Sequence, residues 1–357
     1  MVDPFVDREK LTSSPPAAGE PVLSVRDLSV HFPTDDGVVK AVDGVSFDVF
    51  ENEVLGIVGE SGSGKSVTSM AILGLLPKTA RVEGDVRFRG RSLLELSDGE
   101  LQAFRGSHLA MVFQDALTAL NPVYRVGSQI GEAIKVHNPG LSGDEVRAQV
   151  VDLLALVGIP NPQHRVDEYP HEYSGGMRQR AMIAMSIAND PDVLIADEPT
   201  TALDVTIQAQ VLEVLERVQA RTNSAIILIT HDLGVVAGVA DRVLVMYAGR
   251  AVEVGNVDQV FYETQHPYTL GLLASLPRLD QDTKDMRLHR IVGQPPSLIN
   301  VPPGCPFHPR CNFARTPDPC ATDRPELRPL DALDHVASCH FSERVRNTTP
   351  DQLRAEA

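Results

Sequence analysis

The fold is decided by the stretch Gly59-Glu60-Ser61-Gly62-Ser63-Gly64-Lys65-Ser66, which matches the phosphate-loop pattern G-x-x-x-x-G-K-[S/T]. An apolar run before it, residues 53–58, predicts a buried strand, and helical spacing over residues 66–76 predicts a helix after it. In this setting backbone N–H groups can surround a triphosphate, and glycines permit the close approach. We expect Lys65 to reach the β- and γ-phosphates and the Ser66 hydroxyl to bind Mg²⁺. A glycine-rich turn without function is the alternative, and the flanking elements argue against it.

Composition narrows the possible functions. The chain has 357 residues, 48 acidic and 32 basic, with a formal net charge of −16, and 43% of its residues are apolar. The acidic balance argues against a protein that binds the phosphate backbone of nucleic acids. No apolar run approaches the roughly 18–20 residues that cross a bilayer. We therefore expect a protein on the cytoplasmic side that reaches the membrane only through partners.

Changes in composition along the chain indicate its domains. The first residues are polar, contain several prolines and lack the apolar core of a signal peptide, which favours disorder. Beyond about Pro277 proline becomes frequent and periodicity fades, so we place a boundary near residues 277–290. We expect a disordered tail over residues 1–21, a main domain over 22–277 with a helical subdomain at about 115–175, a C-terminal extension over 278–345, and a tail over 346–357.

Hydrophobic periodicity indicates an α/β fold. Alternation over residues 23–32 and 42–49 predicts two antiparallel strands around a turn at residues 34–37. Further strands are expected at residues 84–90, 109–114, 193–196, 225–230, 243–247 and 251–254, and helices at 97–104, 146–157, 177–189 and 207–218. Alternating strands and helices imply a mostly parallel core, with an antiparallel β subdomain and a helical subdomain beside it.

A second motif places two carboxylates at the end of an apolar strand. Val193-Leu194-Ile195-Ala196-Asp197-Glu198 fits a Walker B segment. Asp197 is expected to hold Mg²⁺, and Glu198, one residue further, to orient the water that attacks the γ-phosphate. An acidic turn after a strand is the alternative reading of these two residues on their own.

A third motif, Tyr173-Ser174-Gly175-Gly176-Met177, offers a hydroxyl, backbone N–H groups and a helix N-terminus to an anion. A glycine-rich helix cap would have the same sequence. In this order with the other motifs, the chain resembles the ATPases of ABC transporters, whose signature loop is L-S-G-G-Q. Tyr173 and Met177 replace the leucine and the glutamine. The resemblance implies an ABC-type P-loop NTPase that binds ATP and Mg²⁺. It also implies a dimer, because the loop contacts the γ-phosphate held by the opposite subunit.

The resemblance also implies a role for further residues. Phe32 would stack on adenine, Gln114 would contact Mg²⁺ and sense the membrane subunits, Asp204 would lie at the dimer seam, and His231 would contact the γ-phosphate. We expect Glu198→Gln to keep ATP binding and to abolish turnover. The expected catalytic residues are Glu198, His231 and Lys65. The expected nucleotide-binding residues are Phe32, Gly59, Glu60, Ser61, Gly62, Ser63, Gly64, Lys65, Ser66, Val67, Gln114, Ser174, Gly175, Gly176 and Asp204. The expected Mg²⁺ ligands are Ser66, Gln114 and Asp197.

Several longer stretches resemble one group within that family, the ATPases of oligopeptide and dipeptide importers. They are the segments at residues 113–122, 175–185, 197–208, 266–269 and 302–311. The resemblance implies a peripheral subunit at the cytoplasmic face of the cell membrane. Its partners would be a second ABC ATPase, in this group often a different chain, two membrane permeases and an extracytoplasmic substrate-binding protein. Nickel, glutathione and oligosaccharides are alternative cargoes.

Two other functions compete with transport. A soluble ABC-type ATPase that acts on DNA or ribosomes would need a long coiled-coil insert, two fused ATPase domains or a basic surface, and the sequence has none of them. A regulatory nucleotide binder without hydrolysis is disfavoured by Glu198.

The four cysteines, Cys305, Cys311, Cys320 and Cys339, lie in the last fifth of the chain. They are separated by five, eight and eighteen residues, so the C-x-x-C pair of a typical zinc site is missing. Four thiolates suit either Zn²⁺ or a [4Fe–4S] cluster. The resemblance to the importer group favours [4Fe–4S], with His308 and His340 as alternative ligands, and a chain without metal remains the third possibility.

Overall fold

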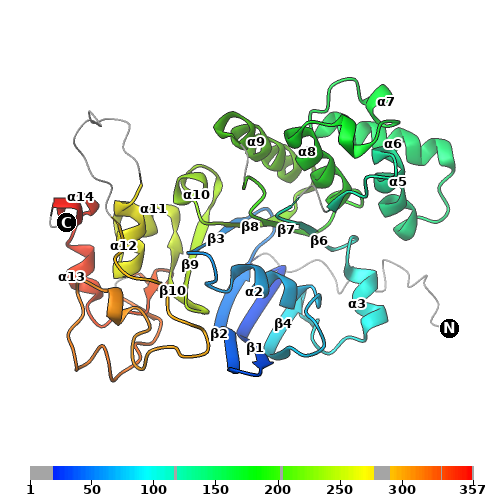
Figure 1. Ribbon diagram of the computed structural model, residues 1–357. Helices are drawn as coiled ribbons and strands as arrows, with labels where there is room; N and C mark the ends of the chain where they lie inside the picture. Colours follow the sequence, from blue (N-terminus) through cyan, green and yellow to red (C-terminus); the bar gives the residue numbers. More distant parts are fainter. Residues whose placement is uncertain (1–18, 116–118, 202–203, 277–289, 331, 356–357) are drawn as a thin grey trace.

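The computed structural model describes residues 19–115, 119–201, 204–276, 290–330 and 332–355. Two sheets, a helical region and a C-terminal region make up this part of the chain (Figure 1). Most of the expected N-terminal tail, and nearly all of the expected boundary near residues 277–290, fall outside the described residues.

The smaller sheet is antiparallel, with strand order β2-β1-β4-β5. Its strands are β1 (Leu23–Thr34), β2 (Gly37–Val49), β4 (Arg81–Phe88) and β5 (Arg91–Ser92). Thr34 pairs with Gly37 at the tight end of the β1–β2 hairpin, and Leu23 pairs with Val49 at its other end. The alternation of apolar and polar residues thus places one face of the hairpin in the core.

The larger sheet has strand order β11-β12-β10-β9-β3-β8-β7-β6. Its strands are β3 (Val54–Val58), β6 (Leu109–Val112), β7 (Val193–Asp197), β8 (Ala225–Thr230), β9 (Arg242–Tyr247), β10 (Arg250–Asn256), β11 (Arg328–Pro329) and β12 (Val336–Ala337). The five strands from β9 to β6 are parallel, and β10 to β12 extend the sheet antiparallel. Every residue of β3, β7 and β8 is buried, as expected for strands covered on both faces.

Two helices follow the early strands. Helix α2 (Lys65–Ile72) starts directly after Gly64, and α3 (Asp98–Phe104) starts with a capping box between Ser97 and Glu100. We expected the first of these helices to continue to residue 76. It ends earlier because Gly74 adopts φ +60°, a left-handed conformation that terminates helices.

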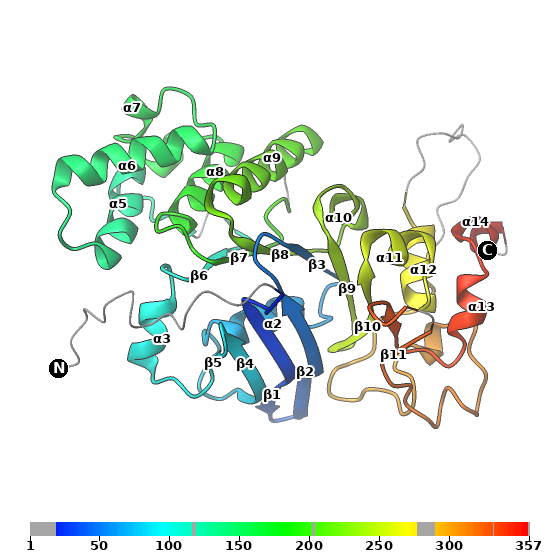
Figure 2. The same cartoon turned by 180° about the vertical axis from the view of Figure 1, so that it is seen from behind.

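The helical region lies beside the β6 edge of the larger sheet (Figure 2). It comprises α5 (Val126–His137), α6 (Gly143–Leu156), α7 (Pro162–Arg165), the 3₁₀ turn η1 (Pro170–Glu172), α8 (Gly175–Ser186) and α9 (Val205–Thr222). A shared apolar core, including Ile130, Leu154 and Ile183, joins these helices to the sheet. None of the helices in the part of the chain that the structure describes has the length and apolar character needed to span a bilayer.

The C-terminal region packs against the β10 side of the larger sheet. It follows α10 (Leu233–Val239) and contains α11 (Val257–Tyr262), α12 (Pro267–Ala274), the turn η2 (His308–Arg310), α13 (Ser342–Arg346) and α14 (Pro350–Ala355). The last residues, which we expected to be a tail, include helix α14, whose Leu353 is only 3% exposed. Apolar burial against α12 thus corrects that expectation for residues 350–355.

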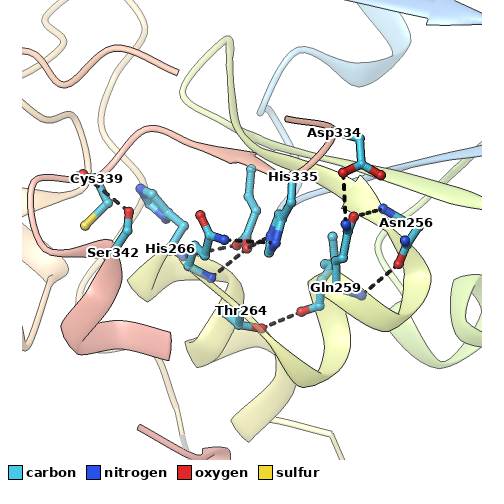
Figure 3. A network of polar contacts seen from close by, with 11 residues as sticks. Asn256, Gln259, Thr264, His266, Asp334, His335, Cys339 and Ser342 are labelled. Atoms are coloured by element: carbon cyan, nitrogen blue, oxygen red, sulfur yellow. Dashed lines mark hydrogen bonds and ion pairs between the residues drawn. The ribbon is translucent and has the colours of Figure 1, made fainter. Parts of the chain in front are cut away.

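A buried polar network joins the C-terminal region to the sheet (Figure 3). Glu253 of β10 is fully buried and accepts hydrogen bonds from the backbone N–H groups of Gln265, at 2.6 Å, and His266, at 3.1 Å. His335, just before β12, pairs with the same carboxylate at 2.9 Å. Since a buried carboxylate is costly without such partners, the network fixes how these segments pack.

Candidate nucleotide-binding site

A cavity of about 570 Å³ opens at the carboxyl ends of the parallel strands. This edge is where open α/β sheets bind ligands. Most of the nucleotide-binding and catalytic residues expected from the phosphate loop and the Walker B strand meet here. The cavity is lined by Gly59, Glu60, Ser61, Gly62, Gly64, Lys65, Ser66, Val67, Gln114, Glu198, His231 and Leu272.

The phosphate loop wraps around the side chain of Lys65. Its Nζ donates hydrogen bonds to the carbonyl oxygens of Gly59, at 2.7 Å, and Glu60, at 3.0 Å, and the residue is 4% exposed. Burial lowers the pKa of Lys65, and the nearby carboxylates of Glu198, Asp197 and Glu60 oppose that shift.

Gly64 is required by the turn from loop to helix. It has φ +103°, and a Cβ there would lie 2.3 Å from the carbonyl oxygen of Ala41. No other residue type fits this position without a shift of backbone. The turn directs the N-terminal N–H groups of α2 into the cavity, where they can bind an anion.

A hydroxyl and a carboxylate meet next to the loop. Ser66 Oγ donates a hydrogen bond to Asp197 Oδ1 at 3.0 Å. Asp197 is 3% exposed, and burial is the main cause that raises its pKa. The cavity also receives the Gln114 amide. Oxygen ligands of this kind, few in number and open to substrate phosphates, fit Mg²⁺.

Glu198 lies at the centre of a small polar cluster. Its Oε2 accepts hydrogen bonds from Gln114 Nε2, at 2.9 Å, and Thr201 Oγ1, at 2.8 Å, and lies 3.5 Å from His231 Nδ1. Its backbone adopts φ +47°, an uncommon conformation for a side chain of this size, and its N–H donates to the carbonyl of Ile229. Such backbone strain concentrates at functional sites.

Other predicted residues lie away from this cavity. Phe32 is half-buried in β1, opposite Val39, and packs against the core. Ser174 is exposed at the N-terminus of α8, where its Oγ accepts from the N–H of Met177 at 3.3 Å. Gly175 is exposed, whereas Gly176 is buried against α9. Asp204 is exposed and caps that helix through the N–H of Ile207. The structure therefore does not bring the signature loop to the cavity of the same chain.

The four cysteines converge in the C-terminal region and are all free thiols. Burial is the main cause that raises the pKa of Cys311 to about 12; a hydrogen bond with the Phe313 backbone acts in the opposite direction, and the neighbouring cysteines add to the rise. Each sulfur also faces a backbone N–H, for example Phe341 N to Cys339 Sγ at 3.3 Å and Arg315 N to Cys320 Sγ at 3.4 Å.

A metal centre at these cysteines is not supported by the geometry. Among the described residues, no three or more His, Cys, Asp or Glu side chains are grouped closely enough to hold a metal ion. The structure therefore brings the four thiols into one region, as a [4Fe–4S] or zinc site would require, but it does not assemble them into a ligand set.

Sequence reasoning missed several residues that line the cavity or contact residues that line it. Thr201 contacts Glu198, Leu272 of α12 lines the wall, and the Tyr268 hydroxyl accepts from the N–H of Glu60 at 2.8 Å. Arg310 pairs with the Glu60 carboxylate. Thr201 follows the Walker B carboxylates by three residues, which is a usable signal. The other three come from a distant segment, and no local pattern marks them.

Comparison with known proteins is consistent with this geometry. Residues 42–201 match the family described as ABC transporter, and residues 252–320 match the oligopeptide/dipeptide transporter C-terminal region. The dipeptide transport ATP-binding protein DppD of Bacillus subtilis (strain 168) is 55% identical over 294 residues, which are 82% of this chain and 87% of that protein. The chain therefore belongs to the ABC transporter family of ATP-binding proteins, in the group that carries this C-terminal region.

Further comparisons extend the likeness. The oligopeptide transport ATP-binding protein OppD of Mycobacterium bovis is 53% identical over 325 residues, 91% of this chain and 52% of that protein. The chain thus spans about half the length of this relative. The ATP-binding cassette MJ0796, solved as a dimer bound to ADP and Pi, aligns with a TM-score of 0.60 at 25% identity, over 66% of this chain and 98% of that one. The predicted family and the predicted ABC-type fold are both confirmed.

Proposed function

We propose that this chain is the ATP-hydrolysing subunit of an importer for di- or oligopeptides. One observation carries the proposal: the phosphate loop and Glu198 line one cavity with Gln114 and His231, and Asp197 is bonded to Ser66 beside it, in a chain 55% identical to a dipeptide transport ATP-binding protein. The identity of the cargo is the more specific part of the proposal. It rests on the names of the relatives, and nickel, glutathione or oligosaccharide would be consistent with the same ATPase site.

The cavity supports a division of roles in hydrolysis. The N–H groups of the loop and Lys65 would bind the phosphates, while Ser66 and Asp197, with Gln114, would hold Mg²⁺. That ion supplies charge neutralisation to the phosphates when bound. Glu198 would orient and deprotonate the attacking water, and His231, close to its carboxylate, would contact the γ-phosphate.

A second subunit would complete the site. Ser174, Gly175 and Asp204 are exposed and away from the cavity of their own chain. We therefore propose that they face the ATP held by a second ABC ATPase, while Phe32 meets the adenine of the chain's own ATP. Two membrane permeases and an extracytoplasmic binding protein complete the proposed assembly, which places this chain peripherally at the cytoplasmic face of the membrane.

The cysteine segment carries a separate proposal, a [4Fe–4S] cluster with a structural role. The described residues contain no assembled ligand set, so the proposal rests on the resemblance and on four free thiols, each near a backbone N–H of the kind that tunes such clusters. Anaerobically purified chain should then be brown and contain iron and acid-labile sulfide. A colourless chain with stoichiometric zinc would favour the alternative metal, and a chain with neither would reject both.

The experiment that tests the proposed function compares the unaltered chain with Glu198→Gln in the assembled complex. We expect both to bind Mg-ATP, and the variant to lose turnover by at least about 100-fold, since general-base catalysis contributes on that order. Stimulation of turnover by peptides added with the binding protein tests the cargo. Unchanged hydrolysis in the variant would remove Glu198 from its proposed role.

A further inference from the structure

An ion pair connects the C-terminal region to the phosphate loop. Arg310, at the end of turn η2, donates through Nη1 to Glu60 Oε2 at 2.6 Å and through Nη2 to Glu60 Oε1 at 3.0 Å. The two residues are 250 positions apart. Glu60 is the second residue of the phosphate loop and lines the nucleotide cavity.

The surroundings of Arg310 hold its guanidinium in place. The side chain is only 5% exposed and lies over the rings of Tyr247 and Phe307, 5.8 and 6.0 Å from their centroids. Its Nε donates to the carbonyl of Val292 at 3.2 Å. A planar guanidinium fixed in this way matches a carboxylate through two parallel hydrogen bonds, which lysine cannot reproduce.

Glu60 is held from three directions. Arg310 binds its carboxylate, the Tyr268 hydroxyl accepts from its N–H at 2.8 Å, and Lys65 donates to its carbonyl at 3.0 Å. Tyr268 also belongs to the segment after β10, so two of the three contacts come from outside the loop and its helix. The conformation of the loop thus depends on residues that the phosphate-loop motif does not contain.

The ion pair between Arg310 and Glu60 also neutralises a negative charge next to the cavity. The Glu60 carboxylate lies at the wall of a cavity proposed to receive the triphosphate of ATP, and an unpaired carboxylate there would repel it. Removing one partner of a buried, hydrogen-bonded charge pair costs more than the pair itself contributes, because the other charge stays behind unpaired.

We propose that Arg310 is a positioning residue of the nucleotide site: it holds the second residue of the phosphate loop in place and cancels the negative charge of Glu60 where the triphosphate binds. The inference rests on the proposed function, since it requires the cavity to bind ATP. The C-terminal region then contributes directly to nucleotide affinity.

Nucleotide affinity of the full-length chain tests the proposal. We expect Arg310→Met to weaken binding of Mg-ATP about tenfold, equivalent to about 1.4 kcal/mol, and to raise KM in the assembled complex more than it lowers kcat. Arg310→Lys should give an intermediate loss. Added salt should reduce the deficit, because it screens the partly exposed Glu60 charge.

A double variant separates this role from a general packing role. Glu60→Gln removes the charge that Arg310 compensates, so Glu60→Gln combined with Arg310→Met should bind Mg-ATP more tightly than Arg310→Met alone. Arg344→Met is the matched control: Arg344 lies over Phe313 in the same region, 5.3 Å from the ring centroid, and should bind nucleotide as the unaltered chain does.

Two results would overturn the inference. One is an Arg310→Met variant that binds Mg-ATP as tightly as the unaltered chain. The other is a loss that is equally large with and without Glu60→Gln, since Arg310 would then act through folding of its own region. Failure of the unaltered chain to bind Mg-ATP is a different outcome, because it rejects the proposed function as well.

Discussion

Two charged residues of the nucleotide site, Lys65 in the cavity wall and Asp197 bonded to Ser66 beside it, are buried before any nucleotide binds. Lys65 and Asp197 are 4% and 3% exposed, and burial is the main cause that lowers the pKa of the lysine and raises that of the aspartate. Both shifts mean that the charged forms are less favourable than in water. A bound triphosphate and its cation would supply the missing opposite charges, so affinity for Mg-ATP gains from this arrangement.

Thr201 allows a test of how closely Glu198 must be held. Its Oγ1 donates to Glu198 Oε2 at 2.8 Å, and the residue is not among those that line the cavity. We expect Thr201→Val to lower kcat for ATP about fivefold, corresponding to roughly 1 kcal/mol for one hydrogen bond, and to leave KM unchanged. Steady-state ATPase assays measure both. Thr222→Val, which removes a hydroxyl bonded to the backbone of α9, should change neither.

His266 gives a prediction about pH. The ring is 1% exposed, and burial lowers its pKa from 6.5 to about 3, while a backbone hydrogen bond with Ser338 acts in the opposite direction. The unfolded chain takes up a proton near pH 6.5, whereas the folded chain does so only near pH 3. The free energy of unfolding must therefore fall as the pH drops through this window, by about 1.4 kcal/mol per pH unit.

The matched variant for this test is His266→Asn. His266 Nδ1 accepts from the N–H of Tyr268 at the start of α12, and asparagine is also a good helix cap. Urea unfolding at pH 6.5 and at pH 5.0 gives the drop in the free energy of unfolding between the two pH values. We expect this drop to be smaller by about 2 kcal/mol in the variant than in the unaltered chain. Glu253 and His335 are present in both proteins, so the difference isolates His266. Parallel losses would mean that His266 becomes protonated without unfolding.

Among the elements, those with a simple pattern could be predicted from the sequence. The β1–β2 hairpin alternates in burial around its turn, and β7 and β8 are short, mostly apolar runs, which favour buried strands. Helix α12 was not predicted because seven of its eight residues are buried, which leaves no amphipathic period to detect. The short α13 and α14 are stable through contacts with α12, and such contacts are invisible in a local pattern.

Helix α14 should contribute measurably to stability. Leu353 packs in an apolar cluster with Leu270 and Ala274 of α12, and Arg354 donates to the carbonyl oxygens of Ala274, at 2.8 Å, and Leu276, at 2.9 Å. We expect Leu353→Ala to lower the free energy of unfolding by about 2–4 kcal/mol, measured by urea denaturation. The exposed Gln352→Glu, which keeps an acceptor for the Thr349 N–H at the start of α14, is the control and should stay within about 0.5 kcal/mol. An equal loss in both would show that α14 does not pack as a unit.

At the scale of the molecule, the sequence predicted residues that lie within one motif and missed contacts between distant ones. The phosphate loop follows β3, Asp197 ends β7 and Glu198 comes directly after it, so the parallel sheet brings them to one edge. The contact of Arg310 with Glu60 joins segments 250 residues apart, and only the folded chain reveals it. The signature loop differs from both: its motif is clear in the sequence, but the loop lies away from the nucleotide cavity of its own chain.

A substitution at Gly175 tests whether the signature loop contacts ATP held by a second subunit. Gly175 is exposed at the start of α8, it has an ordinary negative-φ backbone, and a Cβ there would meet no atom within 4 Å. Gly175→Glu should therefore fold and bind Mg-ATP as the unaltered chain does. A partner's triphosphate would face the added negative charge and bulk, so association of the two ATP-binding subunits should be lost. Because Glu198→Gln should trap the ATP-bound dimer, sedimentation of that variant with Mg-ATP, with and without Gly175→Glu, measures the effect.

The comparison distinguishes a shared site from a self-contained one. With a shared site, Glu198→Gln forms an ATP-dependent dimer, alone or mixed with its companion ATP-binding subunit, and Gly175→Glu prevents it. Gly143→Glu, at an exposed glycine on α6 with equally open surroundings, adds the same charge away from the proposed seam and should leave the dimer intact. If Gly175→Glu dimerises normally and the complex turns over ATP at the full rate, the signature loop does not contact the nucleotide, because a carboxylate at that helix end could not coexist with a bound γ-phosphate.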